Sequence, residues 1–138
     1  RVTSKKHALQ ELAAAVARVT DLDERAVFDV LMEREKLGTT GVGNGIAIPH
    51  GKLPGLDKLY GMFARMEKPI DFQAIDEQPV DLIFLLLAPE SAGADHLKAL
   101  ARVSRLLRDR ATCDKLRGTD NAEALYAILS NSADVQAA

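Results

Sequence analysis

The chain has 138 residues, the length of one compact domain, and its 18 basic and 20 acidic residues leave a formal net charge of -2. These charges are interspersed, whereas a protein that binds nucleic acid by electrostatics carries a basic stripe. The single cysteine, Cys113, excludes an intramolecular disulfide and a thiolate zinc cluster. The longest apolar run, Leu82 to Ala88, is too short to span a bilayer.

The start of the sequence shows no basic segment followed by an apolar stretch, which a secretion signal would require. We therefore expect a cytoplasmic protein without membrane insertion. Because the first residue is Arg1 rather than Met, we also expect that the native N-terminus is missing.

Two amphipathic helices are predicted first. Apolar residues recur at helical spacing from Thr3 to Val19. A second helix is expected to follow an N-cap at Asp21 or Asp23 and to end between Lys36 and Gly38. The apolar positions are Leu9, Leu12, Val16 and Val19 in the first helix and Ala26, Val27, Val30 and Leu31 in the second.

Arg34 extends the apolar stripe of the second helix, because it follows Leu31 by three residues and Val30 by four. Two interpretations are open. The guanidinium group can be an anion clamp, since its fork of donors matches phosphate oxygens. Alternatively, the side chain snorkels to solvent at the end of the helix.

The segment from Gly38 to Gly45 holds four glycines and one asparagine, a composition that predicts a loop with unusual dihedral angles. A strand is expected from Ile46 to His50, with alternate residues on one face and with Pro49 marking a strand end or edge. His50 thus ends a strand, where α/β proteins place ligand sites, and its imidazole can offer a lone pair near neutral pH. The alternative is a surface or capping histidine without chemistry.

The second half of the chain predicts a further series of elements. In order, they are a strand at Leu59–Met66, a loop at Pro69–Pro79 with a short strand at Ile70–Phe72, a buried central strand at Val80–Ala88, a helix at His96–Arg108 with Leu97, Leu100, Val103 and Leu107 on one side, and a helix at Asn121–Leu129 capped by Asp120. Together these patterns predict a single-domain α/β sandwich over residues 1–138, with a mixed sheet of about four or five strands flanked by helices on both faces.

His96 falls in the first turn of its predicted helix, where free amides and the helix dipole favour an anion. It can equally be a helix-start histidine in solvent. Histidines at metal-ligand spacing, a dinucleotide fingerprint and a Walker lysine are missing from the sequence, so we expect neither a metal nor a cofactor. Cys113 is expected to be a small buried apolar residue.

The stretch GTTGVGNGIAIPHGKLPGL resembles the enzyme IIA family of the phosphoenolpyruvate-dependent phosphotransferase system. The similarity is greatest to the fructose/mannitol branch (type 2) and its nitrogen-regulatory member, and it extends to VDLIFLLLAPE and DHLKALARVSRLLRD. This resemblance implies that His50 is the phosphorylated nucleophile and that Arg34 and His96 line the same pocket. The glycine-rich loop, with Thr39, Thr40, Gly43 and Asn44, is expected to form a wall of the phosphate pocket.

The implied function is a histidine phosphocarrier that accepts its phosphoryl group from an HPr-like histidine phosphocarrier protein. Docking is expected on an apolar rim of Leu53, Pro54 and Leu56, and the output is expected to be regulatory, toward a target such as a transporter or a sensor kinase. Two alternatives are open. The chain can be a sugar-transport enzyme IIA that passes phosphate to a IIB domain, or a signalling module that binds an anion without covalent chemistry.

Overall fold

The computed structural model describes residues 3–119 and 121 and divides the chain into two compact units, the first ending at Gly93 and the second beginning at Ala94. Over the described residues the first unit contains two helices and five strands, and the second contains two helices. The predicted mixed α/β fold with a sheet of four or five strands is confirmed. Within these residues, no helix combines the length and the apolar content that a membrane span requires.

The two N-terminal helices, α1 (Lys5–Val19) and α2 (Glu24–Lys36), begin at side-chain caps. The Ser4 hydroxyl accepts a hydrogen bond from the amide of His7, and the Asp23 carboxylate accepts one from the amide of Ala26. Of the two predicted caps for α2, Asp23 is therefore the one used. Val19, expected in the apolar stripe, is 66% exposed because it is the last residue of its helix.

The central strand of the sheet is β5 (Val80–Pro89). Strand β4 (Tyr60–Ile70) pairs antiparallel along one edge of β5. Strands β2 (Ile46–Ala47) and β3 (His50–Leu53) pair parallel with β5 in a common register, Ile46 opposite Leu82 and His50 opposite Leu86. Because β4 pairs with the same β5 residues, β2 and β3 must share the opposite edge.

The predicted strand from Ile46 to His50 is thus interrupted at Ile48 and Pro49. The Ile48 amide turns away from β5 and donates to the Thr40 carbonyl, while the Pro49 carbonyl still accepts from Leu86. The predicted glycine loop also contains a strand, β1 (Gly41–Gly43), paired antiparallel with β2. Asn44 and Gly45 both have positive φ, 58° and 80°, so they form the tight turn that an Asn-Gly pair favours.

Strand β4 is longer than predicted, since it continues through Pro69 to Ile70. Its register shifts between Arg65 and Ile70, and among the described strands it pairs only with β5. A proline is tolerated at such an irregular edge position, because no ladder hydrogen bond is lost there. Phe72, assigned to a short strand by the sequence, lies in the loop and is fully buried.

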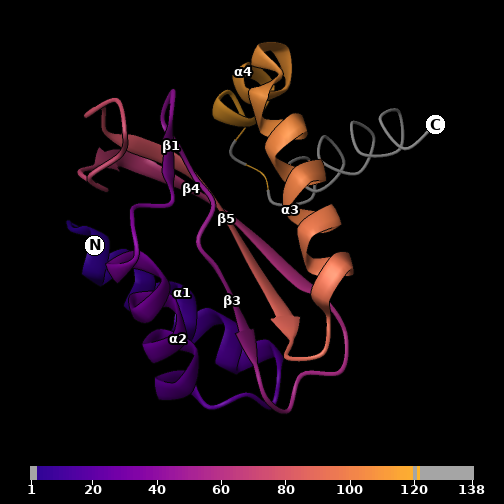
Figure 1. The fold of residues 1–138 in the computed structure, drawn as a ribbon. Coiled ribbons are helices and arrows are strands. Elements are labelled where there is room, and N and C mark those ends of the chain that lie inside the picture. The colour runs from indigo at the N-terminus through magenta and orange to yellow at the C-terminus, as the bar shows by residue number, and fades with distance from the viewer. Residues whose placement is uncertain (1–2, 120, 122–138) are drawn as a thin grey trace. The chain divides into compact units, whose positions relative to one another are not determined.

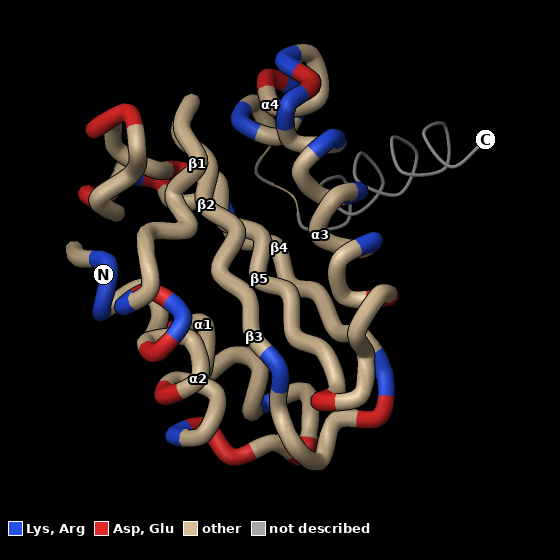
Figure 2. The backbone as a smooth tube through the Cα atoms, in the orientation of Figure 1, with Lys and Arg blue, Asp and Glu red and all other residues tan. Residues whose placement is uncertain are grey.

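One apolar core joins α1 and α2 to one face of the sheet (Figure 1). Charged residues lie mainly on the helices and loops, whereas the middle of the sheet is almost free of them (Figure 2). The buried members of this core are Ala8, Leu9, Leu12, Ala13, Val16, Val27, Leu31, Ala47, Leu53, Ile70, Phe72, Ala74, Val80, Ile83, Leu85 and Leu87.

The second unit contains α4 (Arg110–Arg117) and, apart from its first residue, α3 (Gly93–Arg108); the cap Asp109 separates the two helices. Leu97, expected on the apolar side of α3, is 69% exposed, whereas Val103 and Leu107 are buried as expected and His96 is buried in place of Leu97. Cys113 is buried as predicted, and its thiol donates to the Leu107 carbonyl. The helix predicted at Asn121–Leu129 with its cap Asp120 lies, apart from Asn121, outside the described residues.

Candidate active site

The imidazole of His50 is held by the main chain of the segment just before its strand. Its Nδ1 lies 2.8 Å from the carbonyl oxygen of Ile48. A carbonyl can only accept, so Nδ1 must carry the proton and donate. In the neutral ring, Nε2 is then left with the lone pair. The contact therefore selects the tautomer in which Nε2 is the nucleophilic nitrogen.

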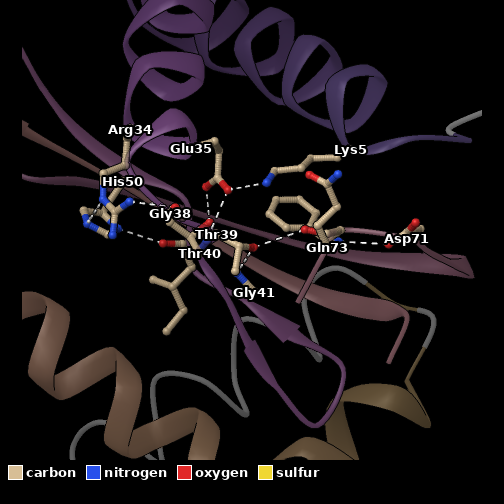
Figure 3. Close-up of polar contacts among 12 residues, drawn as sticks. Lys5, Arg34, Glu35, Gly38, Thr39, Thr40, Gly41, His50, Asp71 and Gln73 are labelled. Atoms are coloured by element: carbon tan, nitrogen blue, oxygen red, sulfur yellow. Dashed lines mark hydrogen bonds and ion pairs between the residues drawn. The ribbon is translucent and has the colours of Figure 1, made fainter. Parts of the chain in front are cut away.

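Arg34 approaches this same nitrogen from α2 (Figure 3). Its Nε donates to His50 Nε2 across 3.2 Å, and its Nη1 donates to the Gly38 carbonyl across 2.9 Å. The side chain of Arg34 is partly exposed, and so is His50. The structure thus brings a cationic donor fork and a nucleophilic nitrogen together at the surface of the first unit, from residues 16 positions apart in the sequence.

Close packing of α2 on β3 makes this approach possible. A Cβ atom added to Gly51 would lie 2.3 Å from Cγ1 of Val30, so only glycine fits at this contact. Val30 precedes Arg34 by one helical turn, and Gly51 follows His50 directly. The packing of one valine on one glycine therefore fixes how near the guanidinium comes to the imidazole.

Burial lowers the pKa of His50 below 6.5, and the positive charge of Arg34 lowers it further. The hydrogen bond to Ile48 and the negative charge of Glu35 act in the opposite direction but do not outweigh burial. His50 is consequently neutral at neutral pH. A neutral imidazole is the form that can attack an electrophile.

Sequence reasoning missed a buried carboxylate beside this pair, that of Glu35. Its side chain is 4% exposed and forms an ion pair with Lys5 of α1 at 2.7 Å. It also accepts from the Thr40 amide at 3.1 Å and from the Thr40 hydroxyl. The signal was present in the spacing: Glu35 follows Leu31 by four residues, which places an acid on the buried stripe of α2.

Three of the four loop residues predicted to wall a phosphate pocket, Thr39, Thr40 and Asn44, form other hydrogen bonds in this structure. Thr39 donates its hydroxyl to the Phe72 carbonyl at 3.1 Å, and Thr40 donates its hydroxyl to Glu35. Gly43 and Asn44 lie at the β1–β2 turn, where the Asn44 amide donates to Asp76 at 2.9 Å. That bond and one from the amide of Gln78 lower the pKa of Asp76. Contact of these four residues with a phosphoryl group stays a prediction.

His96 is the fourth residue of α3 and belongs to the second unit, and its side chain is buried. Its predicted convergence with His50 on one pocket stays a prediction. The predicted docking rim needs one correction: Leu53 is 2% exposed and belongs to the core, because β3 directs it inward. Leu56 is partly buried against that core, and Pro54 is exposed.

A lone pair on a neutral imidazole beside a guanidinium suits transfer of a phosphoryl group. The family model described as "Phosphoenolpyruvate-dependent sugar phosphotransferase system, EIIA 2" matches residues 1–132. The chain belongs to this family. As an enzyme IIA of type 2, it is a component of a phosphotransfer system.

Among enzyme IIA proteins, this chain is similar to nitrogen-regulatory members. A nitrogen regulatory protein of Bradyrhizobium diazoefficiens is 65% identical over 130 residues, covering 94% of this chain and 85% of that protein. The crystal structure of the nitrogen regulatory protein IIA-Ntr from Neisseria meningitidis matches with a TM-score of 0.88 and 40% identity, over 94% of this chain and 88% of that one. A fructose-specific EIIA component of Haloferax volcanii is 40% identical over 122 residues, covering 88% of this chain and 78% of that protein.

Proposed function

We propose that this enzyme IIA is a histidine phosphocarrier that accepts a phosphoryl group on Nε2 of His50 from an HPr-like phosphocarrier protein and has a regulatory output. The observation that carries the proposal is the pair of contacts on one imidazole: Nδ1 donates to Ile48, and Nε2 faces Arg34. An acceptor histidine in phosphoryl transfer requires a fixed tautomer and a nearby cation.

The proposed step moves one phosphoryl group between two imidazoles. The lone pair of His50 Nε2 attacks phosphorus, a new N–P bond forms, and the N–P bond of the donor histidine breaks with its electron pair returning to the donor ring. The Nδ1 proton of His50 stays on its nitrogen throughout, held by the Ile48 carbonyl. Since one N–P bond replaces another, the step is reversible and needs no general base.

Arg34 has a different task before and during transfer. In the free protein its Nε–H points at the lone pair of Nε2, the position that phosphorus must take. The guanidinium therefore turns from the nitrogen to the phosphoryl oxygens as the donor arrives, and its donor fork offsets their charge. His96 is proposed to donate to a phosphoryl oxygen, and Thr39, Thr40, Gly43 and Asn44 remain its proposed loop wall.

Labelling from phosphoenolpyruvate tests the proposal. The chain is incubated with phosphoenolpyruvate, enzyme I and the phosphocarrier protein, and its intact mass is measured before and after acid treatment. Wild type should gain one phosphoryl group that is lost in acid and kept in base. His50→Ala should gain none, whereas Arg34→Ala should be labelled more slowly, by roughly 10²- to 10³-fold if it acts as one oxyanion donor does.

His7, a partly exposed residue of α1, provides the matched control, since His7→Ala removes a histidine other than the proposed acceptor. It should be labelled like wild type. An acid-stable phosphate points to a hydroxyl such as Thr39, Thr40 or Ser91. That result, or full labelling of His50→Ala, contradicts the phosphocarrier proposal and favours the anion-binding module.

The regulatory output is supported by the 65% identity with a nitrogen regulatory protein, compared with 40% for a fructose-specific EIIA component. We therefore propose a target such as a transporter or a sensor kinase in the cytoplasm. The sugar-transport alternative predicts rapid loss of label to an added IIB domain. A phosphorylated chain that keeps its label with IIB, and whose binding to its target changes with phosphorylation, supports the regulatory role.

A further inference from the structure

The carboxylate of Glu35 lies at the start of a hydrogen-bonded route to the imidazole of His50. The side chain is almost fully buried, and a charge in that position needs partners. Lys5 supplies the compensating cation at 2.7 Å, and the Lys5 ammonium also lies 5.1 Å from the centre of the Phe72 ring. Glu35 is thus held from α1 while its two oxygens face Thr40.

From Thr40 the route continues through main-chain groups to Ile48 and His50. The amide and the hydroxyl of Thr40 both donate to the Glu35 carboxylate, so two hydrogen bonds fix the position of Thr40. Its carbonyl accepts from the Ile48 amide at 3.0 Å. The Ile48 carbonyl then accepts from His50 Nδ1 at 2.8 Å. Each group in the series orients the next one.

The same carboxylate constrains the Arg34 contact. The loop between Glu35 and Thr40 is closed at one end by the Gly38 amide, which donates to the main-chain carbonyl of Glu35 at 3.2 Å. At the other end it is closed by the carboxylate. The Gly38 carbonyl, which accepts from Arg34 Nη1, lies inside this closed loop.

We infer that Glu35 is a positioning residue of the acceptor site, which acts through Thr40 and Ile48 to fix the tautomer of His50 and through the loop at Gly38 to fix Arg34. Lys5 holds its carboxylate in place through the ion pair. The inference concerns the geometry of the free protein, and only its kinetic consequence rests on the proposed phosphocarrier function.

The test compares two glutamates of the same helix. Glu35→Gln removes the charge and one acceptor oxygen, whereas Glu33→Gln makes the same change at a residue whose side chain is 72% exposed and pairs with Lys36. Nitrogen-15 NMR of the imidazole reports the tautomer and the titration of His50 without any phosphorylation. Labelling from phosphoenolpyruvate reports the rate.

In Glu35→Gln we expect a mixture of both tautomers at His50 and a lower titration midpoint, because a negative charge that raises the pKa is gone. Labelling should slow by about 10- to 100-fold, as expected for a reacting group displaced by up to 1 Å. Glu33→Gln should match wild type in all three readouts. Wild-type tautomer, titration and rate in Glu35→Gln would overturn the inference.

A second pair of variants decides the matter if Glu35→Gln does not fold. Thr40→Val keeps the side-chain shape and the main-chain amide but loses the hydroxyl that donates to the Glu35 carboxylate. Thr40→Ser keeps both the amide and the hydroxyl donor. Mixed tautomers in Thr40→Val with recovery in Thr40→Ser support the route; identical spectra for both variants overturn it. If wild type is not labelled at all while the tautomer responds, the phosphocarrier proposal fails and the positioning role stands.

Discussion

Replacing Gly51 with alanine should separate the two central groups of the site. The new Cβ would lie 2.3 Å from Val30 Cγ1, and carbon atoms pack at about 3.5–4.0 Å, so a gap of at least about 1.2 Å has to open. Val30 cannot turn its methyl away, because a valine in a helix has essentially one χ1 rotamer. Helix α2 must therefore shift from β3.

A shift of this size is too large for the hydrogen bond between Arg34 and His50 to persist. The Nε–Nε2 distance is already 3.2 Å, at the upper end of the range for such hydrogen bonds, so an added ångström breaks it. Overpacking of this kind costs about 1–3 kcal/mol. The melting temperature should fall by roughly 4 °C for each kcal/mol. The pKa of His50 should rise toward 6.5, since burial and Arg34, the two causes that lower it, both weaken.

Thermal unfolding and a histidine NMR titration measure both effects. The double variant Gly51→Ala with Val30→Ala restores room and should recover the titration of wild type, with a coupling energy of about 0.5–3 kcal/mol between the two sites. Gly118→Ala is the matched control, because its added Cβ would meet only ordinary contacts, the nearest at 3.5 Å. If Gly51→Ala melts and titrates like wild type, the packing argument is wrong.

Three further results are expected. Because only neutral His50 can attack and its pKa is lowered, the labelling rate should stay constant through pH 6.5 and fall only below it; a half-maximal rate at or above pH 6.5 contradicts this. The same lowered pKa links the stability of the fold to pH. The contribution of His50 to the free energy of unfolding is fully present above pH 6.5 and is progressively lost as the pH falls from 6.5 to the folded-state pKa. Denaturant unfolding at several pH values should show this decline in wild type, and His50→Gln should remove it. Leu31→Ala, which empties a fully buried position of α2, should cost about 2–5 kcal/mol in denaturant unfolding, whereas the exposed Leu37→Ala should stay within about 0.5 kcal/mol.

Periodicity was sufficient for the elements that bury a regular face. The helices α1 and α2 and the strand β5 were predicted near their observed bounds because their apolar residues repeat at 3.6 residues or run without interruption. Arg34 and His50 were found because each departs from such a pattern. The route from Glu35 to His50 was not predictable, since most of its links are main-chain groups whose direction depends on tertiary pairing.

Turn chemistry accounts for most of the differences between the elements predicted from the sequence and those in the structure. The Asn44–Gly45 pair is a strong hairpin signal, yet it was assigned to a loop because the flanking strands are only three and two residues long. The interruption at Ile48 follows from a hydrogen bond to Thr40, a partner eight residues away that no local pattern specifies. Leu97 was misplaced because His96 occupies the buried position that periodicity assigned to a leucine.

The acceptor that fixes the His50 ring is a peptide carbonyl two residues earlier in the chain, rather than a side chain. Such an acceptor is present whatever amino acid stands at position 48, so no single substitution there can delete it. A substitution that keeps the amide of residue 48 also keeps its hydrogen bond to Thr40, so the side chain there can change while the proton stays on the same ring nitrogen. Control of the nucleophile therefore lies in the path of the backbone between Thr40 and His50 rather than in the side chain at position 48.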